Sequence, residues 1–238
     1  MNKIGQAELK LLKEIYKDNL DYALKKLDEN YPIQYLIGYV DFYNTKIKVN
    51  EHVLIPRYET EILVDKILNF LKNKDYKNLI DICTGSGAIA IALSKELKTK
   101  ISACDISNEA LEIARENAKE NNVEIEFFQI DILKETIKEK YDCIISNPPY
   151  VTYEEYVSEE TKYEPQIALY AENNGLEFYE KIIKDAVNIL NSNGSIIFEI
   201  GAKQANDIKK IALSYFPDSK VTILKDYNNF DRFLFIET

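Results

Sequence analysis

A short apolar strand leads into a glycine turn in the stretch Leu79-Ile80-Asp81-Ile82-Cys83-Thr84-Gly85-Ser86-Gly87. The residues from Ser86 to Leu97 favour a helix, so the two glycines fall on a strand-to-helix turn. Glycine suits such a turn because it tolerates a positive φ and lets a ligand approach the backbone. The stretch therefore predicts an open α/β sheet that binds a ligand at the carboxyl ends of its strands.

Strands and helices alternate from this turn to the C-terminus. The apolar patterns predict strands at 79–83, 100–105, 124–130, 141–146, 195–200, 221–225 and 231–236, with helices at 86–97, 108–121, 175–191 and 203–215. Such alternation is typical of a largely parallel, doubly wound sheet with helices on both faces. Because no helix separates the last two strands, we expect them to pair as a hairpin, with the final strand antiparallel.

Ahead of this sheet, the sequence predicts helices and one β-hairpin. Apolar residues recur at helical spacing from Gln6 to Leu27, and Asn19 suggests a break between two helices. Short strands at 39–43 and 46–49 flank Asn44-Thr45 and predict the hairpin. We divide the chain into a short helical segment at 1–30, a connector with the hairpin at 31–55, and an α/β domain at 56–238 that begins with a helix at 60–71.

A second informative stretch, Asn147-Pro148-Pro149-Tyr150, directly follows the strand predicted at 141–146. The asparagine offers an amide oxygen and an amide NH2 group on a short stem. The prolines have no N–H, so the carbonyls around them stay free to accept hydrogen bonds, and the tyrosine adds a flat face. These groups can hold a planar NH2 group. The structural alternative is a proline-terminated strand with an Asx turn.

The glycine turn also matches a nucleotide-binding pattern. Gly85, Gly87 and Ala90 satisfy G-x-G-x-x-G/A, and Asp105 ends the next strand, where it can bind a ribose. This pattern alone does not separate NAD from other adenosine ligands, and a turn built for packing is its structural alternative. An NAD-dependent oxidoreductase would need a proton donor that nothing obvious supplies. A non-enzymatic nucleotide-binding module would have no use for the 147–150 stretch.

Composition narrows the class of protein. The chain has 238 residues and a formal net charge of −10, which disfavours sequence-independent binding to nucleic acid. Its three cysteines, Cys83, Cys104 and Cys143, are too widely spaced for a typical zinc site, so we expect reduced thiols and no metal. His52 is expected to have a surface or hydrogen-bonded structural role rather than a catalytic one. With no signal-like N-terminus and no membrane-length apolar run, we expect a cytoplasmic protein that does not bind membranes.

Together the two motifs resemble those of class I S-adenosylmethionine-dependent methyltransferases that act on amino groups. The segment Ile55-Pro56-Arg57-Tyr58-Glu59-Thr60-Glu61 narrows the resemblance to the PrmC/HemK family, the glutamine methyltransferases of peptide chain release factors. The stretch 32–38 with Phe42, and the stretch 163–165 with Ala168-Leu169, also match that family. The resemblance extends from about Pro32 to the C-terminus. The Asn-Pro-Pro-Tyr motif alone is shared with DNA adenine methyltransferases.

The resemblance implies a fold, a reaction and a set of site residues. The fold is a Rossmann-like, seven-stranded methyltransferase sheet, and the reaction methylates the side-chain amide of the glutamine in a Gly-Gly-Gln loop of a release factor. The substrate amide is expected at Asn147, Pro148, Pro149 and Tyr150, with Asn147, Pro148 and Tyr150 in catalytic roles and the tyrosine stacked on the amide plane. S-adenosylmethionine, converted to S-adenosylhomocysteine, is expected to contact Cys83, Thr84, Gly85, Ser86, Gly87, Asp105, Asp131, Ile132 and Asn147. The enzyme is expected to be a monomer.

Three features depart from the family pattern. Only about thirty residues precede the hairpin, where relatives carry a substantial helical bundle that helps to bind the release factor. Cys83 stands where glycine is common; because cysteine disfavours a positive φ, we expect Gly85 and Gly87 to make the turn. Ile132 stands where relatives often place an aromatic ring against the adenine, whose amino group we assign to Asp131.

Several alternatives stay open. A glutamine methyltransferase of a ribosomal protein would share the chemistry, whereas a DNA adenine or small-molecule amine methyltransferase should need a basic groove or a recognition insert. The segment at 57–61 has two interpretations: helix capping by Thr60 or Glu59 with Arg57 in a surface ion pair, or a lining of the cofactor and substrate clefts. An ion pair is expected for Asp231 and Arg232 in the final hairpin, and structural roles for Glu164 and Glu199.

Overall fold

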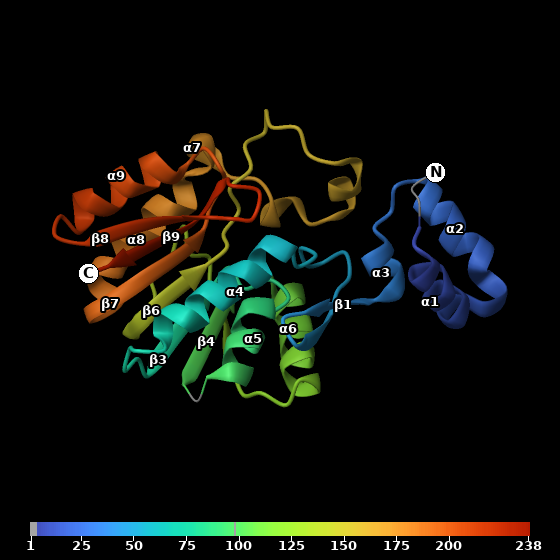
Figure 1. Ribbon diagram of the computed structural model, residues 1–238, viewed down its shortest axis with the longest axis horizontal. Helices are drawn as coiled ribbons and strands as arrows, with labels where there is room; N and C mark the ends of the chain where they lie inside the picture. The colour runs from blue at the N-terminus through green and yellow to red at the C-terminus, as the bar shows by residue number, and fades with distance from the viewer. Residues whose placement is uncertain (1–3, 98) are drawn as a thin grey trace.

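The computed structural model describes residues 4–97 and 99–238, and in this part of the chain a seven-stranded sheet has the order β5-β4-β3-β6-β7-β9-β8 (Figure 1). The strands are β3 (Asn78–Ile82), β4 (Lys100–Asp105), β5 (Glu126–Gln129), β6 (Tyr141–Ser146), β7 (Leu190–Glu199), β8 (Lys220–Lys225) and β9 (Asp231–Glu237). Pairing is parallel from β5 to β7, whereas β9 runs antiparallel to both of its neighbours. The predicted sheet with an antiparallel final strand is confirmed.

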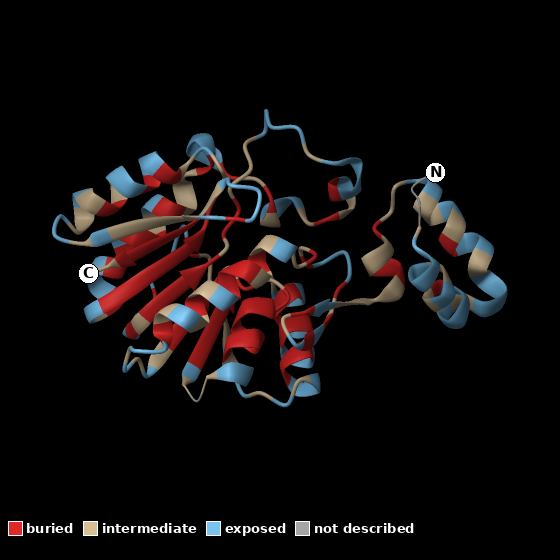
Figure 2. Ribbon diagram, viewed as in Figure 1, coloured by how far each residue is buried: buried red, intermediate tan, exposed pale blue. Residues whose placement is uncertain are grey.

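Helices cover both faces of the sheet (Figure 1). One face carries α4 (Tyr58–Leu71), α5 (Ala88–Glu96) and α6 (Asn108–Glu120); the other carries α8 (Glu177–Ile189) and α9 (Ala205–Tyr215). Two buried apolar clusters fill the spaces between helices and sheet, and Figure 2 shows that burial is concentrated on the strands and on α4 and α5. Among the described residues, no helix is both long and apolar enough to cross a membrane.

The N-terminal helices lie beside the sheet rather than on it (Figure 1). They are α1 (Gln6–Tyr16), the 3₁₀ turn η1 (Lys17–Asn19), α2 (Leu20–Asp28) and α3 (Ile33–Ile37). The break expected at Asn19 is therefore confirmed, whereas the connector expected after residue 30 contains the short helix α3. Residues 1–3 of the predicted helical segment lie outside the described residues. A small apolar cluster of its own, with Leu12, Ala23 and Leu36 buried, holds the segment together.

The hairpin consists of β1 (Tyr39–Phe42) and β2 (Thr45–Lys48), joined by a two-residue turn. Tyr43 and Asn44 make this turn with φ values of 38° and 59°. Two central residues with positive φ are the feature of a type I′ turn, whose twist matches that of the flanking strands. The predicted turn at Asn44-Thr45 was therefore wrong by one residue, because Thr45 already pairs with Phe42.

Asn117 on α6 connects the hairpin to the glycine turn. Its side chain is fully buried, and its Oδ1 accepts from the Lys48 N–H at 2.7 Å. Its Nδ2 donates to the Lys48 carbonyl at 3.1 Å and to the Ser86 carbonyl at 2.9 Å. One amide therefore satisfies three backbone groups from two distant segments, and it fixes where the hairpin meets the sheet domain.

Replacing Asn117 with alanine should lower the free energy of unfolding by about 2–4 kcal/mol, because three hydrogen bonds are lost and backbone groups stay buried without partners. Chemical denaturation measures the change. The matched control is Asn121→Ala, since Asn121 makes similar bonds to Lys46 at a more exposed position; it should cost under about 1 kcal/mol. Equal effects of the two substitutions would contradict this account of how the hairpin is attached.

Candidate active site

A cavity of about 410 Å³ opens at the carboxyl ends of β3, β4 and β6. This is where open α/β sheets bind ligands, and the volume lies within the usual range for small-molecule sites. Of the residues predicted for the site, the cavity wall includes Cys83, Thr84, Gly85, Ser86, Asp105, Asp131, Ile132, Asn147 and Pro149. The sheet thus brings the two sequence motifs together on one cavity.

The turn after β3 has positive φ values at three residues, whereas the sequence predicts them at the two glycines only. Cys83, Gly85 and Gly87 have φ values of 61°, 54° and 81°. The expectation that Cys83 would avoid a positive φ was wrong. The Thr84 N–H donates to the Cys104 carbonyl at 3.0 Å, and the Thr84 hydroxyl donates to Asp81 at 2.6 Å. These bonds hold the backbone in a conformation that costs a non-glycine residue about 1–2 kcal/mol.

The two glycines have different surroundings. A Cβ placed on Gly87 would lie 3.1 Å from side-chain atoms of both Ile91 and Ala114, so this glycine lets the turn pack against α5 and α6. A Cβ placed on Gly85 would meet no described heavy atom within 4 Å. The space over Gly85 belongs to the cavity, whose wall includes Gly85 but not Gly87. Gly85 is therefore the glycine at which a ligand can approach the backbone.

Asp105 joins the end of β4 to this turn. Its carboxylate accepts from the Gly85 N–H at 2.8 Å and from the Ser107 N–H at 3.0 Å. Burial raises the pKa of Asp105, and these backbone hydrogen bonds oppose the rise. Each carboxylate oxygen keeps a further lone pair for a ligand. Asp105 can thus accept hydrogen bonds from a sugar while it holds the turn.

Asp81 supports the turn from inside the protein. Burial raises its pKa to about 7, and the hydrogen bond from Thr84 opposes the rise. Its second oxygen, Oδ1, has no hydrogen-bond partner among the residues that the structure describes. Protonation of Asp81 would remove this buried unpaired charge. Because Asp81 accepts from the Thr84 hydroxyl inside the turn, its role is structural.

Asp131 and Ile132 follow β5 and contribute to the cavity wall. A hydrogen bond from Lys134 holds the pKa of Asp131 below its usual range, and the two charged groups are 2.7 Å apart. Ile132 is buried and presents an apolar side chain. An acceptor next to an apolar surface is the combination that an adenine ring requires.

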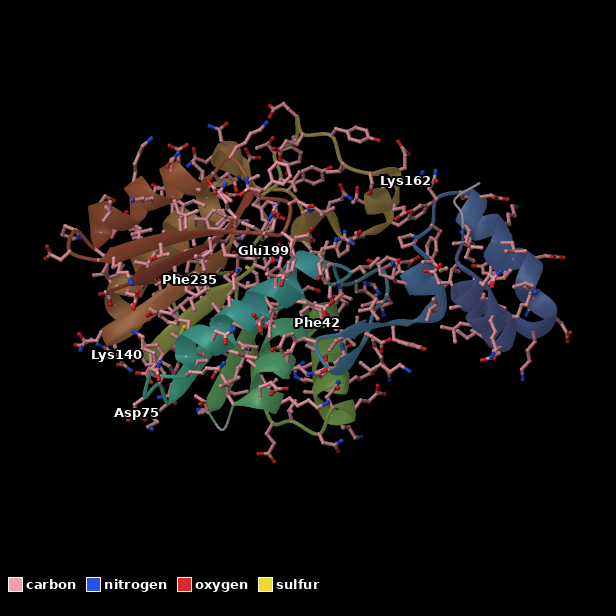
Figure 3. All side chains as sticks on the ribbon, in the orientation of Figure 1. Phe42, Asp75, Lys140, Lys162, Glu199 and Phe235 are labelled. Carbon is pink, nitrogen blue, oxygen red and sulfur yellow. The ribbon has the colours of Figure 1, made fainter. Side chains whose placement is uncertain are left out.

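Asn147 follows β6 and reaches toward the first turn of α4. Its Nδ2 donates to Thr60 Oγ1 over 3.4 Å, and the Thr60 hydroxyl donates to Glu199 Oε2 at 2.8 Å. Figure 3 shows Glu199 in the middle of the molecule, near the beginning of α4. Burial raises the pKa of Glu199 to about 7. Of the two interpretations of the segment at 57–61, capping by Thr60 or Glu59 was wrong, because α4 begins at Tyr58 and no described side chain caps it.

The other three residues of the second motif, Pro148, Pro149 and Tyr150, differ in whether they line the cavity. Pro149 contributes to the cavity wall, whereas Pro148 and Tyr150 are outside the wall as the described residues define it. The Tyr150 ring is partly buried against the apolar cluster beneath α8 and α9, and burial raises its pKa. The Tyr150 carbonyl accepts from Gln204 at 2.9 Å. The predicted stacking of Tyr150 on a substrate amide stays a prediction.

Arg57 lines the cavity, as one of the two interpretations expected, and its ion pair has a buried partner rather than lying at the surface. It contributes to the cavity wall, and its guanidinium lies 2.5 Å from the carboxylate of Glu164. Glu164 is buried and also accepts from the Ile55 N–H at 3.2 Å. The ion pair therefore connects the segment before α4 to the loop that follows Tyr150.

The structure also places the cysteines, the single histidine and the charged pair expected in the final hairpin. The three cysteines are free thiols. His52 is exposed at the edge of the cavity. Arg232 pairs with Asp226 at 3.4 Å rather than with its neighbour Asp231, which pairs with Lys225. Adjacent strand residues point to opposite sides of a sheet, so a pair between neighbours on β9 was the less suitable choice.

The hydrogen bond between Thr60 and Glu199 is not predicted from the sequence. A local signal existed for each residue. Thr60 lies in the segment that carries the most specific resemblance, and Glu199 is an acidic residue at the carboxyl end of a buried strand. Their contact joins residues 139 positions apart, which no local pattern predicts.

Comparison with known proteins agrees with this geometry. The model of the methyltransferase small domain matches residues 60–162. A release factor glutamine methyltransferase from Lactococcus lactis is 44% identical over 99% of this chain and 85% of its own length. Another from Staphylococcus aureus is 41% identical over 89% of this chain and 78% of its own length.

Solved structures support the fold. A methyltransferase from Pyrococcus furiosus has a TM-score of 0.60 at 19% identity, over 82% of this chain and 89% of its own. A ribosomal protein L11 methylase from Lactobacillus delbrueckii has a TM-score of 0.58 at 21% identity, over 80% of this chain and 82% of its own. The Lactococcus lactis and Staphylococcus aureus relatives are more than 40% identical to the chain over at least 89% of its length and 78% of their own. The chain therefore belongs to the release factor glutamine methyltransferase family.

Proposed function

We propose that this protein transfers a methyl group from S-adenosylmethionine to the side-chain amide nitrogen of the glutamine in a Gly-Gly-Gln loop of a peptide chain release factor. The observation that carries the proposal is a single cavity lined by the Gly85 turn, by Asp105 and by the amide of Asn147. Relatives named for this reaction, at up to 44% identity, support the choice of substrate. The proposal implies a location in the cytoplasm, where translation ends.

The residues of the cavity fit the cofactor. Open space over Gly85 admits a ligand against the backbone, and the Asp105 carboxylate can accept the two ribose hydroxyls. Asp131 and Ile132 offer an acceptor and an apolar surface for the adenine. We propose that Cys83, Thr84 and Ser86 complete this part of the wall, and that Gly87 shapes the turn without contacting the cofactor.

When bound, S-adenosylmethionine supplies a methyl group made electrophilic by the sulfonium. The residues of this chain have the harder task, because the lone pair of an amide nitrogen is delocalised into its carbonyl. The Asn147 Oδ1 atom would accept one of the two amide hydrogens and hold the nitrogen in line with the methyl group. The Pro148 carbonyl, from the residue between two that line the cavity, is proposed to accept the other. Acceptors fixed in advance favour the positive charge that develops on the nitrogen. The extra proton becomes acidic after transfer and leaves to water.

Calorimetry should show saturable binding of S-adenosylhomocysteine to the wild-type protein. Asp105→Ala should weaken this binding by about 1.5–3 kcal/mol, because hydrogen bonds to a charged acceptor are lost. The control is Glu112→Ala, which removes the same charge from an exposed position on α6. Thermal unfolding without ligand separates lost affinity from lost structure. Tight binding of NADH without any response to S-adenosylhomocysteine would refute the cofactor assignment.

Replacing Asn147 with alanine should reduce methyl transfer on the order of a hundredfold or more, as expected when one preorganised group is lost at a reacting centre. Part of the cofactor affinity should survive, since the glycine turn and Asp105 are intact. Asn147→Asp should be strongly impaired, because a carboxylate cannot donate to Thr60 and adds a charge. The assay measures transfer of labelled methyl to an unmethylated release factor.

The control substrate carries Gly-Gly-Ala in place of Gly-Gly-Gln in the loop. Equal labelling of this control, or a near-normal rate for the Asn147→Ala enzyme, would show that the amide of the loop glutamine is not the acceptor that Asn147 orients.

A further inference from the structure

Three side chains form a hydrogen-bonded row that begins in the cavity and ends in the protein interior. Asn147 donates to Thr60, and Thr60 donates to Glu199, over the distances of 3.4 and 2.8 Å given above. Thr60 and Asn147 contribute to the cavity wall, whereas Glu199 is only 2% exposed and lies behind them. Each comes from a different element: the first turn of α4, the loop after β6, and the end of β7.

The direction of these hydrogen bonds follows from what each group can do. An ionised carboxylate only accepts, so the single hydroxyl hydrogen of Thr60 is committed to Glu199. Thr60 Oγ1 can then only accept, and the NH2 of Asn147 is the donor that satisfies it. The Asn147 NH2 also lies close enough to Glu199 to lower its pKa. The amide oxygen of Asn147 must therefore point away from Thr60, toward the space where an incoming NH2 group needs an acceptor.

We infer that Thr60 and Glu199 are positioning residues that fix the orientation of the Asn147 amide and so present its oxygen to the target nitrogen. The inference rests on the proposed function for its substrate, although the row of hydrogen bonds itself does not. A threonine alone could donate or accept, and would leave both amide orientations open. A reversed amide would place an NH2 group against the substrate NH2, with the loss of the acceptor.

The charge on Glu199 controls this direction. The titratable groups that face Glu199 are Glu59 on α4, Arg232 on β9, Tyr150 after β6 and Tyr179 on α8. Burial raises the pKa of Glu199 to about 7; the Thr60 hydrogen bond and Arg232 oppose the rise, and Glu59 adds to it. Once protonated, Glu199 can donate to Thr60, which then becomes free to donate to Asn147 and to reverse the amide. The orientation is therefore enforced above that pKa and released below it.

The test compares Thr60→Val and Glu199→Gln, which keep the shape of each side chain, with the wild-type protein. Both should lower kcat roughly tenfold or more, with little change in the KM for cofactor or in S-adenosylhomocysteine binding. Thr60→Ser, which keeps the hydroxyl, should recover most of the lost rate. The matched control is Thr45→Val, since Thr45 is a buried threonine whose hydroxyl donates to Phe42 within the hairpin; it should reduce stability without reducing kcat.

A pH profile of kcat provides a readout that a structural role alone would not change. The wild-type rate should fall as the pH is lowered through about 7, and this step should disappear in Glu199→Gln. Asp81 titrates in the same range, so a step that survives in Glu199→Gln would assign the profile to Asp81 and count against the inference.

Nuclear magnetic resonance tests the row of hydrogen bonds without any substrate. The side-chain NH2 signals of Asn147, identified by their absence in Asn147→Asp, should be protected from exchange in the wild type and exposed in Thr60→Val and Glu199→Gln. Protected signals in a wild type that methylates no release factor would refute the proposed substrate and support the positioning role. Free exchange in the wild type, or normal kcat in both variants, would overturn the inference. If Thr60→Val does not fold, Glu199→Gln decides the outcome.

Discussion

The hydrogen bond from the Gly85 N–H to the Asp105 carboxylate is the contact on which the cavity depends. It joins the turn after β3 to the end of β4, and parallel pairing of these strands brings both to the same edge of the sheet. The carboxylate thus helps to hold the turn, in which Cys83 and both glycines have positive φ values. Contacts within the protein therefore shape the wall that we assign to the cofactor, and such contacts reduce the ordering that binding would require.

This preformed edge includes two buried carboxylates that oppose folding at neutral pH. Burial raises the pKa values of Asp81 and Glu199 to about 7, from values near 4 in an unfolded chain. The folded state therefore binds more protons than the unfolded state between these limits. Their contribution to stability is complete below the unfolded pKa and is lost as the pH rises through about 7. The pH range in which Glu199 is ionised, and can direct Thr60, is thus the range in which it destabilises the fold.

Local sequence predicts the sheet and both motifs, because apolar runs, glycines and prolines are properties of neighbouring residues. It does not contain the contacts between distant residues. A capping role for Thr60 followed from its position at the start of a predicted helix, yet its hydroxyl donates to a strand end far along the chain. A negative φ for Cys83 followed from the cost of the alternative, yet bonds to Cys104 and Asp81 hold the turn. In each case a tertiary hydrogen bond outweighs a local preference.

The segment at 55–61 contacts two buried carboxylates from distant parts of the chain. Arg57 binds the buried Glu164 in the loop after the second motif, and Thr60, one helical turn later, binds the buried Glu199 at the end of β7. Removing Arg57 would leave the buried charge of Glu164 unpaired, which typically costs several kcal/mol. The same short segment therefore contributes to the cavity wall, and we propose that it also sets the orientation of the Asn147 amide. We propose that the Asn-Pro-Pro-Tyr motif supplies groups that bind an amide, and that Thr60 on the first turn of α4 determines which way the Asn147 amide faces.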